Sequence, residues 1–172
     1  MKPYTDRILM VAIALLTVGL IVVVAPTLQV RIIDVGDTAP NFSIVTESGK
    51  TVTRSDFGGK LLVLNFWASW CPPCIEELPS LNEFAKQYAN QGVVVLGVSI
   101  DKNEKLYRNF LKTRQVAFAT ARDPENNIGA SYGTFQLPET YLIDINGKVR
   151  EKVISNMDWM DPAFLQRVRG ML

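Results

Sequence analysis

The chain has 172 residues and an ordinary globular composition: 48% of its residues are hydrophobic, 20% are charged, and the formal net charge is +1. This balance argues against a disordered chain, and the Lys and Arg residues form no basic stripe for a nucleic acid. The chain contains two cysteines and no histidine. Zinc sites of the Cys₂His₂ and Cys₃His types and a Cys–His nucleophile pair are therefore excluded. We predict no metal, no organic cofactor and no nucleic-acid partner.

The N-terminal part carries a long apolar stretch, residues 8–30, which contains no charged side chain. At a rise of 1.5 Å per residue, a helix of this length spans about 34 Å, enough for a hydrocarbon core of about 30 Å. Lys2 and Arg7 precede the stretch; Arg31 comes directly after it, but Asp34 and Asp37 follow closely. The positive-inside rule then favours a cytoplasmic N-terminus and export of the remainder.

Two alternatives to an uncleaved anchor stay open. A cleaved signal peptide has a shorter apolar region and a small-x-small cleavage site, and the best candidate site, ending at Ala25, is followed by an unfavourable Pro26. A buried core helix is a poor match because the stretch is apolar on all faces. We therefore expect the following division of the chain: a cytoplasmic N-terminus over residues 1–7, a transmembrane anchor over 8–28, a linker over 29–38 and a folded domain over 39–172.

The folded domain has a hairpin pattern near each end. Short β runs at residues 42–45 and 51–53 flank a glycine-containing turn and predict the first hairpin. Residues 140–144 and 148–154 flank Asn146-Gly147, a strong signal for the second. Each hairpin is therefore predicted from its turn as well as from its strands.

Two further runs, residues 61–67 and 93–100, are almost wholly apolar. Such runs are typical of strands buried on both faces of a sheet. Because these strands alternate with helices, they are predicted to belong to a mostly parallel core sheet.

After the first of these strands, apolar residues recur at three- and four-residue steps and predict a helix whose buried face is made of Ile75, Leu78, Leu81, Phe84, Ala85 and Tyr88. Asn103 is a suitable N-cap for a helix that extends to Arg114, with inward residues Leu106, Tyr107, Phe110 and Leu111. A short helix around residues 128–132 and a last helix opened by Asp161-Pro162 follow. The longer elements have the order β-β-β-α-β-α-β-β-α, which predicts one α/β domain with helices covering a mostly parallel sheet that ends in an antiparallel hairpin.

The two cysteines, Cys71 and Cys74, fall where a buried strand ends and a helix begins. Two intervening residues allow their sulfurs to close a disulfide across the first helical turn. Cys71 lies at the helix N-terminus, where free N–H groups and the helix dipole favour a thiolate. We therefore expect Cys71 to attack and Cys74 to resolve the mixed disulfide. The alternatives are a structural disulfide, although a bridge across so short a loop stabilises little, and half of a metal site shared by a dimer.

The residues around this pair resemble the thioredoxin superfamily, specifically its membrane-anchored TlpA/ResA-like branch. The resemblance rests on Trp67–Cys74 with the strand before it, on Gly36–Phe42 and on Leu137–Asp144, and it covers residues 35–172. It implies a thioredoxin-like fold, in which helices flank a central mixed β-sheet with an extra N-terminal β-hairpin, following an N-terminal transmembrane helix.

The resemblance also implies roles for individual residues. Pro138 is expected to be a cis-proline facing the disulfide, with the backbone at Leu137 pairing with an extended substrate segment. Trp70 is expected to cover the disulfide and to form part of the docking surface. Glu77 matches an acidic residue that is linked to tuning of the thiols in the ResA-like group; the alternative is a carboxylate favoured only by the helix dipole. Asn65 stands where ordinary thioredoxins place a buried aspartate, which leaves Glu77 as the substitute base.

The implied activity is that of a thiol–disulfide oxidoreductase in the cell (inner) membrane, single-pass, with its catalytic domain on the periplasmic or extracytoplasmic side. The resemblance favours a reductant of disulfides in exported proteins such as apocytochrome c, re-reduced by a membrane thiol-transfer protein of the CcdA/DsbD type. Thiol oxidase or isomerase activity is the alternative, because the same thiols can run either way.

Two other classes are disfavoured by single residues. A peroxiredoxin-like peroxidase needs Thr or Ser three residues before its reactive cysteine, and Ala68 stands there before Cys71. A copper-binding metallochaperone of this fold uses a distant histidine, which the chain lacks.

Overall fold

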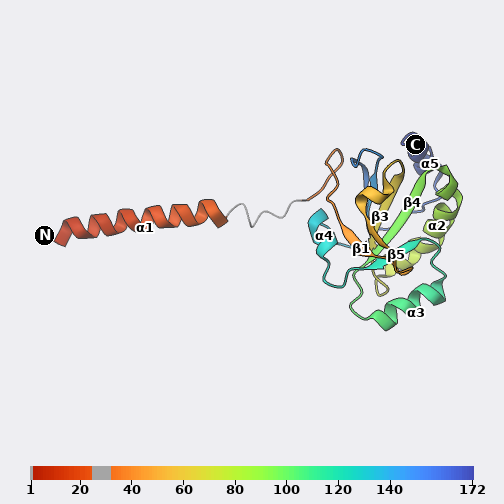
Figure 1. The fold of residues 1–172 in the computed structure, drawn as a ribbon, viewed down its shortest axis with the longest axis horizontal. Helices are drawn as coiled ribbons and strands as arrows, with labels where there is room; N and C mark the ends of the chain where they lie inside the picture. Colours follow the sequence, from red (N-terminus) through yellow and green to blue (C-terminus); the bar gives the residue numbers. More distant parts are fainter. Residues whose placement is uncertain (1, 25–31) are drawn as a thin grey trace. The chain divides into compact units, whose positions relative to one another are not determined.

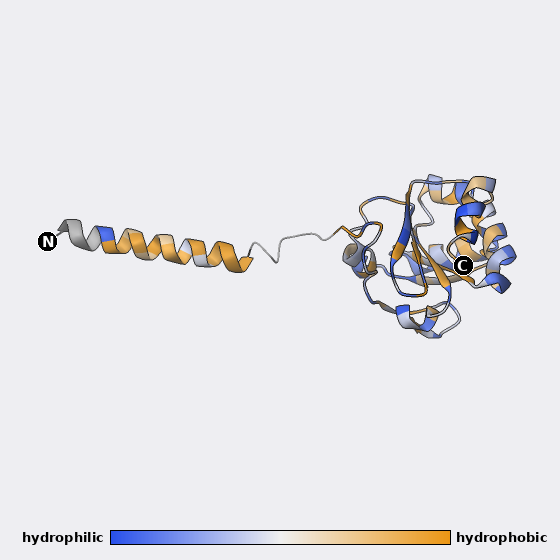
Figure 2. Ribbon diagram, turned by 90° about the horizontal axis from the view of Figure 1, so that it is seen from above, coloured by the Kyte–Doolittle hydropathy of each residue, from blue (hydrophilic) through white to orange (hydrophobic). Residues whose placement is uncertain are grey.

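The computed structural model describes residues 2–24 and 32–172, which fall into an N-terminal helix and a globular domain beginning at Ile32 (Figure 1). Helix α1, Lys2–Val24, is apolar along most of its length (Figure 2). By length and composition its residues 7–24 can cross a membrane. The hydroxyl of Thr17 donates to the carbonyl oxygen of Ala14 at 2.9 Å, so this polar group is satisfied within the helix. Residues 25–31 of the predicted anchor and linker lie outside the described residues.

The globular domain is built on a five-stranded sheet with the strand order β5-β4-β3-β6-β7. Central strand β3 (Leu61–Trp67) pairs in parallel with β4 (Val93–Ser99) and antiparallel with β6 (Glu139–Ile143). Strand β5 (Ala119–Arg122) extends the sheet in parallel beyond β4, and β7 (Val149–Ile154) pairs antiparallel with β6 at the other edge. The sheet is therefore mixed, and the predicted second hairpin is confirmed.

A separate two-stranded sheet precedes the central one. Strands β1 (Ser43–Val45) and β2 (Thr51–Thr53) pair antiparallel, which confirms the predicted N-terminal hairpin. Its turn reaches the edge of the central sheet, where Thr46 forms an antiparallel bridge with Ala121 of β5. Strand β5 was not predicted, because its sequence Ala-Thr-Ala-Arg has no continuous apolar run.

The described part of the globular domain has four α-helices: α2 (Pro72–Tyr88), α3 (Glu104–Arg114), α4 (Asn127–Tyr132) and α5 (Pro162–Arg169), with short 3₁₀ helices η2 (Arg54–Phe57) and η3 (Ala89–Gln91). Two helices begin at the predicted caps. The Asn103 side chain accepts a hydrogen bond from the N–H of Leu106 at 3.2 Å, and the Asp161 side chain accepts one from the N–H of Phe164 at 2.9 Å. Each cap satisfies a backbone donor that a helix leaves unpaired.

The residues of β3 alternate between two hydrophobic cores. Leu62, Leu64 and Phe66 belong to the core that includes residues of the first hairpin and of α4, whereas Leu61 and Val63 belong to the core formed with α2 and α5. All seven residues of β3 are buried. The strand is thus covered on both faces, as its apolar run predicts.

One residue predicted to face inward does not. Leu106 of α3 is 60% exposed, whereas its neighbour Tyr107 is fully buried. Helix α3 contacts the domain through a narrow face, on which the rings of Tyr107 and Phe110 lie 5.9 and 5.2 Å from the ring of Trp67. Successive helical residues point about 100° apart, so Leu106 falls outside this face. Three other residues predicted to face inward, Ile75, Phe110 and Leu111, are half-buried.

Replacement of Phe84 by Ala tests the core beneath α2. The Phe84 ring is fully buried and lies 5.7 Å from the rings of both Trp159 and Phe164. We expect Phe84→Ala to lower the free energy of unfolding by about 3–5 kcal/mol, because it leaves a cavity in a packed core. Urea unfolding of the full chain measures this. Lys86→Ala, on the exposed face of the same helix, is expected to change it by less than about 0.5 kcal/mol, and equal effects of the two substitutions would contradict this packing.

Candidate active site

The disulfide lies where the chain leaves the central strand and enters α2. Cys71 and Cys74 are joined by a disulfide, with their Cα atoms 5.3 Å apart, which confirms the predicted pairing. Cys71 is the N-cap residue of α2, and its Sγ accepts a hydrogen bond from the N–H of Cys74 at 3.3 Å. Pro72 takes the first helical position, where a missing N–H removes no helical hydrogen bond. A Cys71 thiolate would therefore face a free helical N–H group and the positive end of the helix dipole.

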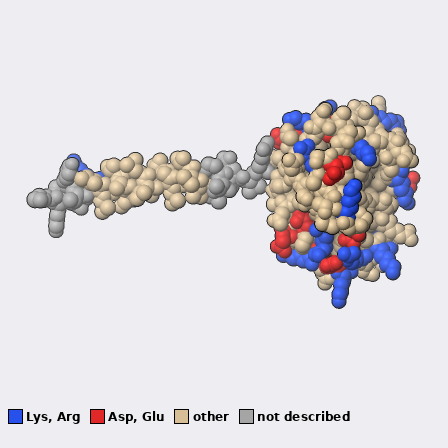
Figure 3. Space-filling model, in the orientation of Figure 1, with Lys and Arg blue, Asp and Glu red and all other residues tan. Residues whose placement is uncertain are grey.

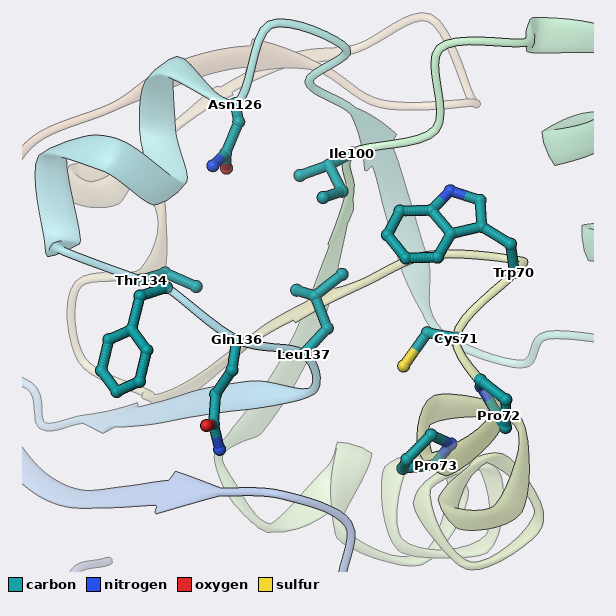
Figure 4. A pocket seen from close by; sticks show the side chains of 10 residues that line it. Trp70, Cys71, Pro72, Pro73, Ile100, Asn126, Thr134, Gln136 and Leu137 are labelled. Atoms are coloured by element: carbon teal, nitrogen blue, oxygen red, sulfur yellow. The ribbon is translucent and has the colours of Figure 1, made fainter.

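The two sulfurs differ in their surroundings. Both cysteine residues are buried, with 4% and 6% of their surface exposed, but Cys71 lines an open hollow of 410 Å³ and Cys74 is not among its lining residues. Figure 4 shows the Cys71 sulfur directed toward the side of this hollow where Leu137 lies. This difference agrees with an attacking role for Cys71 and a resolving role for Cys74, which remain predictions.

The segment opposite the disulfide contains the predicted proline. The Leu137–Pro138 peptide bond is cis, as predicted. Leu137 lines the same hollow as Cys71, across from Trp70 (Figure 4). Trp70 is 64% exposed, as expected of a docking residue, whereas Trp67 is buried in the core. The structure therefore brings Cys71, Trp70 and Leu137 together around one opening.

Glu77 lies one helical turn beyond Cys74 and is buried, with 3% of its surface exposed. Its carboxylate accepts hydrogen bonds from Nδ2 of Asn65 at 3.0 Å and from Nε1 of Trp159 at 3.1 Å. Burial raises the pKa of Glu77 from 4.5 to about 7, although both hydrogen bonds act to lower it. A carboxyl group with a pKa near neutrality can both accept and donate a proton at physiological pH.

Asn65 has a positioning role that the sequence reasoning did not include. Besides the bond to Glu77, its Nδ2 donates to Oγ1 of Thr140 at 2.8 Å, which links β3 to α2 and to β6. Trp159 was also missed as a partner of Glu77. A buried tryptophan N–H needs a hydrogen-bond acceptor, so the sequence indicated that Trp159 would have one. Only the folded chain shows that this acceptor is Glu77.

A second buried carboxylate holds the loop before Cys71. Asp101, 2% exposed, accepts hydrogen bonds from the backbone N–H and the hydroxyl of Ser69, at 2.8 and 2.7 Å, and from the hydroxyl of Ser99 at 2.7 Å. These bonds fix the loop that carries Trp70 and Cys71 to the end of β4. The sequence contained no local signal for this contact, because Ser69 and Asp101 lie 32 positions apart.

A buried ion pair follows the cis-proline. Glu139 is fully buried, and its Oε1 lies 3.0 Å from Nζ of Lys152 on β7. Tyr141 donates a hydrogen bond to the same carboxylate oxygen, and Lys152 also donates to the carbonyl oxygen of Ile33 at 3.1 Å. These contacts tie the strand after Pro138 to the start of the globular domain.

Within the described residues, no group of three or more Cys, Asp or Glu side chains is arranged to hold a metal ion. Lys and Arg are interspersed with Asp and Glu on the visible face of the domain (Figure 3).

Known proteins match this chain over the same domain. A model described as the AhpC/TSA family matches residues 35–152. The thiol-disulfide oxidoreductase ResA of Bacillus anthracis is 37% identical over 120 residues, which cover 70% of this chain and 69% of that protein. ResA of Bacillus subtilis (strain 168) is 35% identical over 122 residues, which cover 71% of this chain and 68% of that protein. A Chlorobium tepidum structure described as a putative thiol:disulfide interchange protein DsbE matches with a TM-score of 0.75 and 32% sequence identity. The match covers 81% of this chain and 98% of that chain.

The mixed sheet and the disulfide at the start of α2 define a thioredoxin-like thiol–disulfide oxidoreductase. The chain belongs to the ResA family of these enzymes, within the thioredoxin-like AhpC/TSA family. Its substrates are accordingly protein disulfides or thiols.

The raised pKa of Glu77 predicts a pH dependence of stability. Because the folded pKa, about 7, exceeds the ordinary value of 4.5, the folded state binds more protons than the unfolded state between these values. The free energy of unfolding of the oxidised chain should therefore fall as the pH rises from about 4.5 to about 7, by on the order of 3 kcal/mol. Urea unfolding across this range measures the slope.

Glu77→Gln should remove most of this slope, because glutamine does not titrate. Glu83→Gln, on the exposed side of the same helix, is the matched control and should keep the wild-type slope. A Glu77→Gln chain with an unaltered slope would show that another group causes the dependence.

Proposed function

We propose that this oxidoreductase is a membrane-anchored reductant that acts on disulfides of exported proteins, such as apocytochrome c. The observation that carries the proposal is the Cys71–Cys74 disulfide at the start of α2. Of the two cysteines, only Cys71 lines the hollow beside the cis Leu137–Pro138 bond. Family membership supports the same activity, since ResA proteins are thiol-disulfide oxidoreductases.

In the proposed reaction, the Cys71 thiolate attacks one sulfur of the substrate disulfide. A mixed disulfide forms, and the other substrate sulfur leaves as a thiolate that takes up a proton. Cys74 then loses its proton and attacks the Cys71 sulfur, which releases the second substrate thiol and restores the Cys71–Cys74 disulfide. Glu77, one turn from Cys74 and with a pKa near 7, is the proposed acceptor of the Cys74 proton.

The oxidised pair must be reduced again before another cycle. A membrane thiol-transfer protein of the CcdA/DsbD type would supply two electrons and two protons by the reverse exchange. The apolar helix over residues 7–24 supports a membrane location, and Lys2 and Arg7 at its start favour a cytoplasmic N-terminus with the domain on the extracytoplasmic side. Confinement to the membrane would raise the effective concentrations of donor and membrane-bound substrates.

Cys74→Ser in the full chain tests the proposed order of attack. Without the resolving thiol, Cys71 should remain bonded to its substrate, so that non-reducing electrophoresis of acid-quenched bacterial cells shows mixed disulfides at several times the wild-type level. Cys71→Ser should show about the wild-type level, because Cys74 does not line the hollow.

Mass spectrometry of the trapped species tests the location. Exported proteins, with a cytochrome c precursor among them, are the expected partners. Trapping by Cys71→Ser instead of Cys74→Ser would reverse the roles of the two thiols, and exclusively cytoplasmic partners would contradict the proposed side of the membrane.

A further inference from the structure

Helix α3 and the residues that flank it differ in charge from the rest of the globular domain. Residues 102–115 contain five basic side chains and one acidic side chain, a formal charge of +4. The whole domain, residues 32–172, has 15 basic and 16 acidic side chains, so the part of it outside this segment has a formal charge of −5. Positive charge concentrated in one short segment creates a local potential that attracts an anionic partner.

The basic side chains of α3 gather on one face of the helix. Lys105, Arg108 and Lys112 follow one another at steps of three and four residues, which places them on the same side, and all three are exposed. Tyr107, on the opposite side, is fully buried. Figure 3 shows Lys and Arg side chains projecting from the lower edge of the domain, where Figure 1 places α3. Lys105, Arg108 and Lys112 thus form a basic face of α3.

Contacts within the domain do not account for this charge. Lys105 and Lys112 form no ion pair with another described residue, and only Arg108 has acidic partners, Glu104 at 2.8 Å and Glu47 at 2.6 Å. Lys105 also lies in the first turn of α3, where the positive end of the helix dipole disfavours a cation. An anionic partner outside the domain would satisfy both lysines.

The basic face begins beside the active site. An open hollow of 830 Å³ at the start of α3 is lined by Lys102, Lys105 and Arg108 among others. Lys102 also lines the neighbouring hollow of 480 Å³ together with Trp70, the exposed residue next to Cys71. An extended anionic surface that contacts the basic face therefore comes close to the loop that carries Cys71.

The membrane is the anionic surface that an anchored chain meets first. Helix α1 ends at Val24, and the globular domain begins at Ile32. The eight Cα-to-Cα steps between these residues reach at most about 29 Å, so a domain tethered by α1 stays at a high effective concentration near the lipid headgroups. Each Lys or Arg near an anionic membrane surface strengthens binding about fivefold.

We propose that the basic face of α3 docks on the anionic phospholipid headgroups of the membrane in which α1 is anchored. The inference deepens the proposed function and rests on its membrane anchor. Docking through this face holds the loop with Trp70 and Cys71 close to the membrane surface, the side from which a membrane thiol-transfer donor would approach. The contact is electrostatic, so screening by salt weakens it.

Lysine acetylation of the full chain in lipid nanodiscs tests the docking. One set of discs contains only zwitterionic phosphatidylcholine, and the other contains equal amounts of phosphatidylcholine and anionic phosphatidylglycerol. A pulse of an uncharged acetylating reagent modifies accessible lysines, and mass spectrometry gives the rate at each one. Lys60 is the internal reference, because it is exposed and directly precedes β3, at the opposite end of that strand from the Cys71 loop.

In the wild-type chain, the lysines of the basic face are expected to be protected by anionic lipid. Relative to Lys60, Lys105 and Lys112 should react at least about threefold more slowly in the anionic discs than in the zwitterionic discs, because lipid phosphates cover them. The difference should disappear in about 1 M salt, where the Debye length is about 3 Å.

The double substitution Lys105→Gln with Lys112→Gln tests the face itself, with Lys102 as the reporter. In the wild type, Lys102 should also react more slowly in the anionic discs. Loss of two lysines should weaken docking by more than about tenfold, so Lys102 should then react alike in both kinds of disc. Lys86→Gln with Lys148→Gln is the matched control, because it removes the same charge from exposed positions outside α3 and should keep the wild-type difference.

Two results would overturn the docking while the anchor stands, as shown by a chain that co-elutes with the discs. Equal relative rates at Lys105 in both kinds of disc would show that lipid does not contact this face and would leave it to an acidic protein partner. A slowing of Lys102 that the double substitution leaves intact would place the lipid contact elsewhere. A chain that elutes apart from both kinds of disc would instead refute the membrane anchor of the proposed function, and the docking with it.

Discussion

Strand β3 is buried on both faces and paired on both edges, and the site is assembled at the end where this strand stops. Its last residue, Trp67, is in register with Ser99 at the end of β4, and Phe66 is in register with Glu139 at the start of β6. The loop to Cys71, the Asp101 network after β4 and the cis-proline before β6 therefore meet where the central strands end. A chain that lost this strand would lose the relative positions of all three.

Burial of polar groups is the second constraint on the site. Glu77 is held by neutral donors, the side chains of Asn65 and Trp159 and the backbone of Met157, and no cation bonds to it among the described residues. Its proton is therefore retained up to a pH near neutrality, because desolvation disfavours the charged form. Asp101 accepts three hydrogen bonds from serine groups, and these bonds place the Cys71 loop. One buried carboxyl group is thus suited to proton exchange and the other to positioning.

Local patterns predicted much of this architecture. The apolar run of β3, the two hairpin turns and the caps Asn103 and Asp161 each act through neighbouring residues, so they can be recognised in the sequence. The cysteine pair is also a local feature, and the cis Leu137–Pro138 bond was expected from family resemblance and not from the residues alone.

What the sequence did not predict depends on contacts between distant segments. Strand β5 is a short edge strand of small and polar residues. It is recognised as a strand by its pairing with β4 and not by its composition. The partners of Asp101 and Trp159 come from remote parts of the chain. Leu106 has the spacing of an inward residue, but α3 packs through so narrow a face that Leu106 lies at the surface, where it lines a shallow hollow.

A dithiol and its disulfide exchange electrons in both directions, so the reduction potential of the pair sets the direction of electron flow. The reduction potential of the Cys71–Cys74 pair in the full chain, equilibrated with dithiothreitol or glutathione couples and read by thiol alkylation, tests it most directly. A reductant is expected to have a potential near or below that of thioredoxin, about −270 mV. A value near about −120 mV, typical of a strong oxidant such as DsbA, would contradict this account.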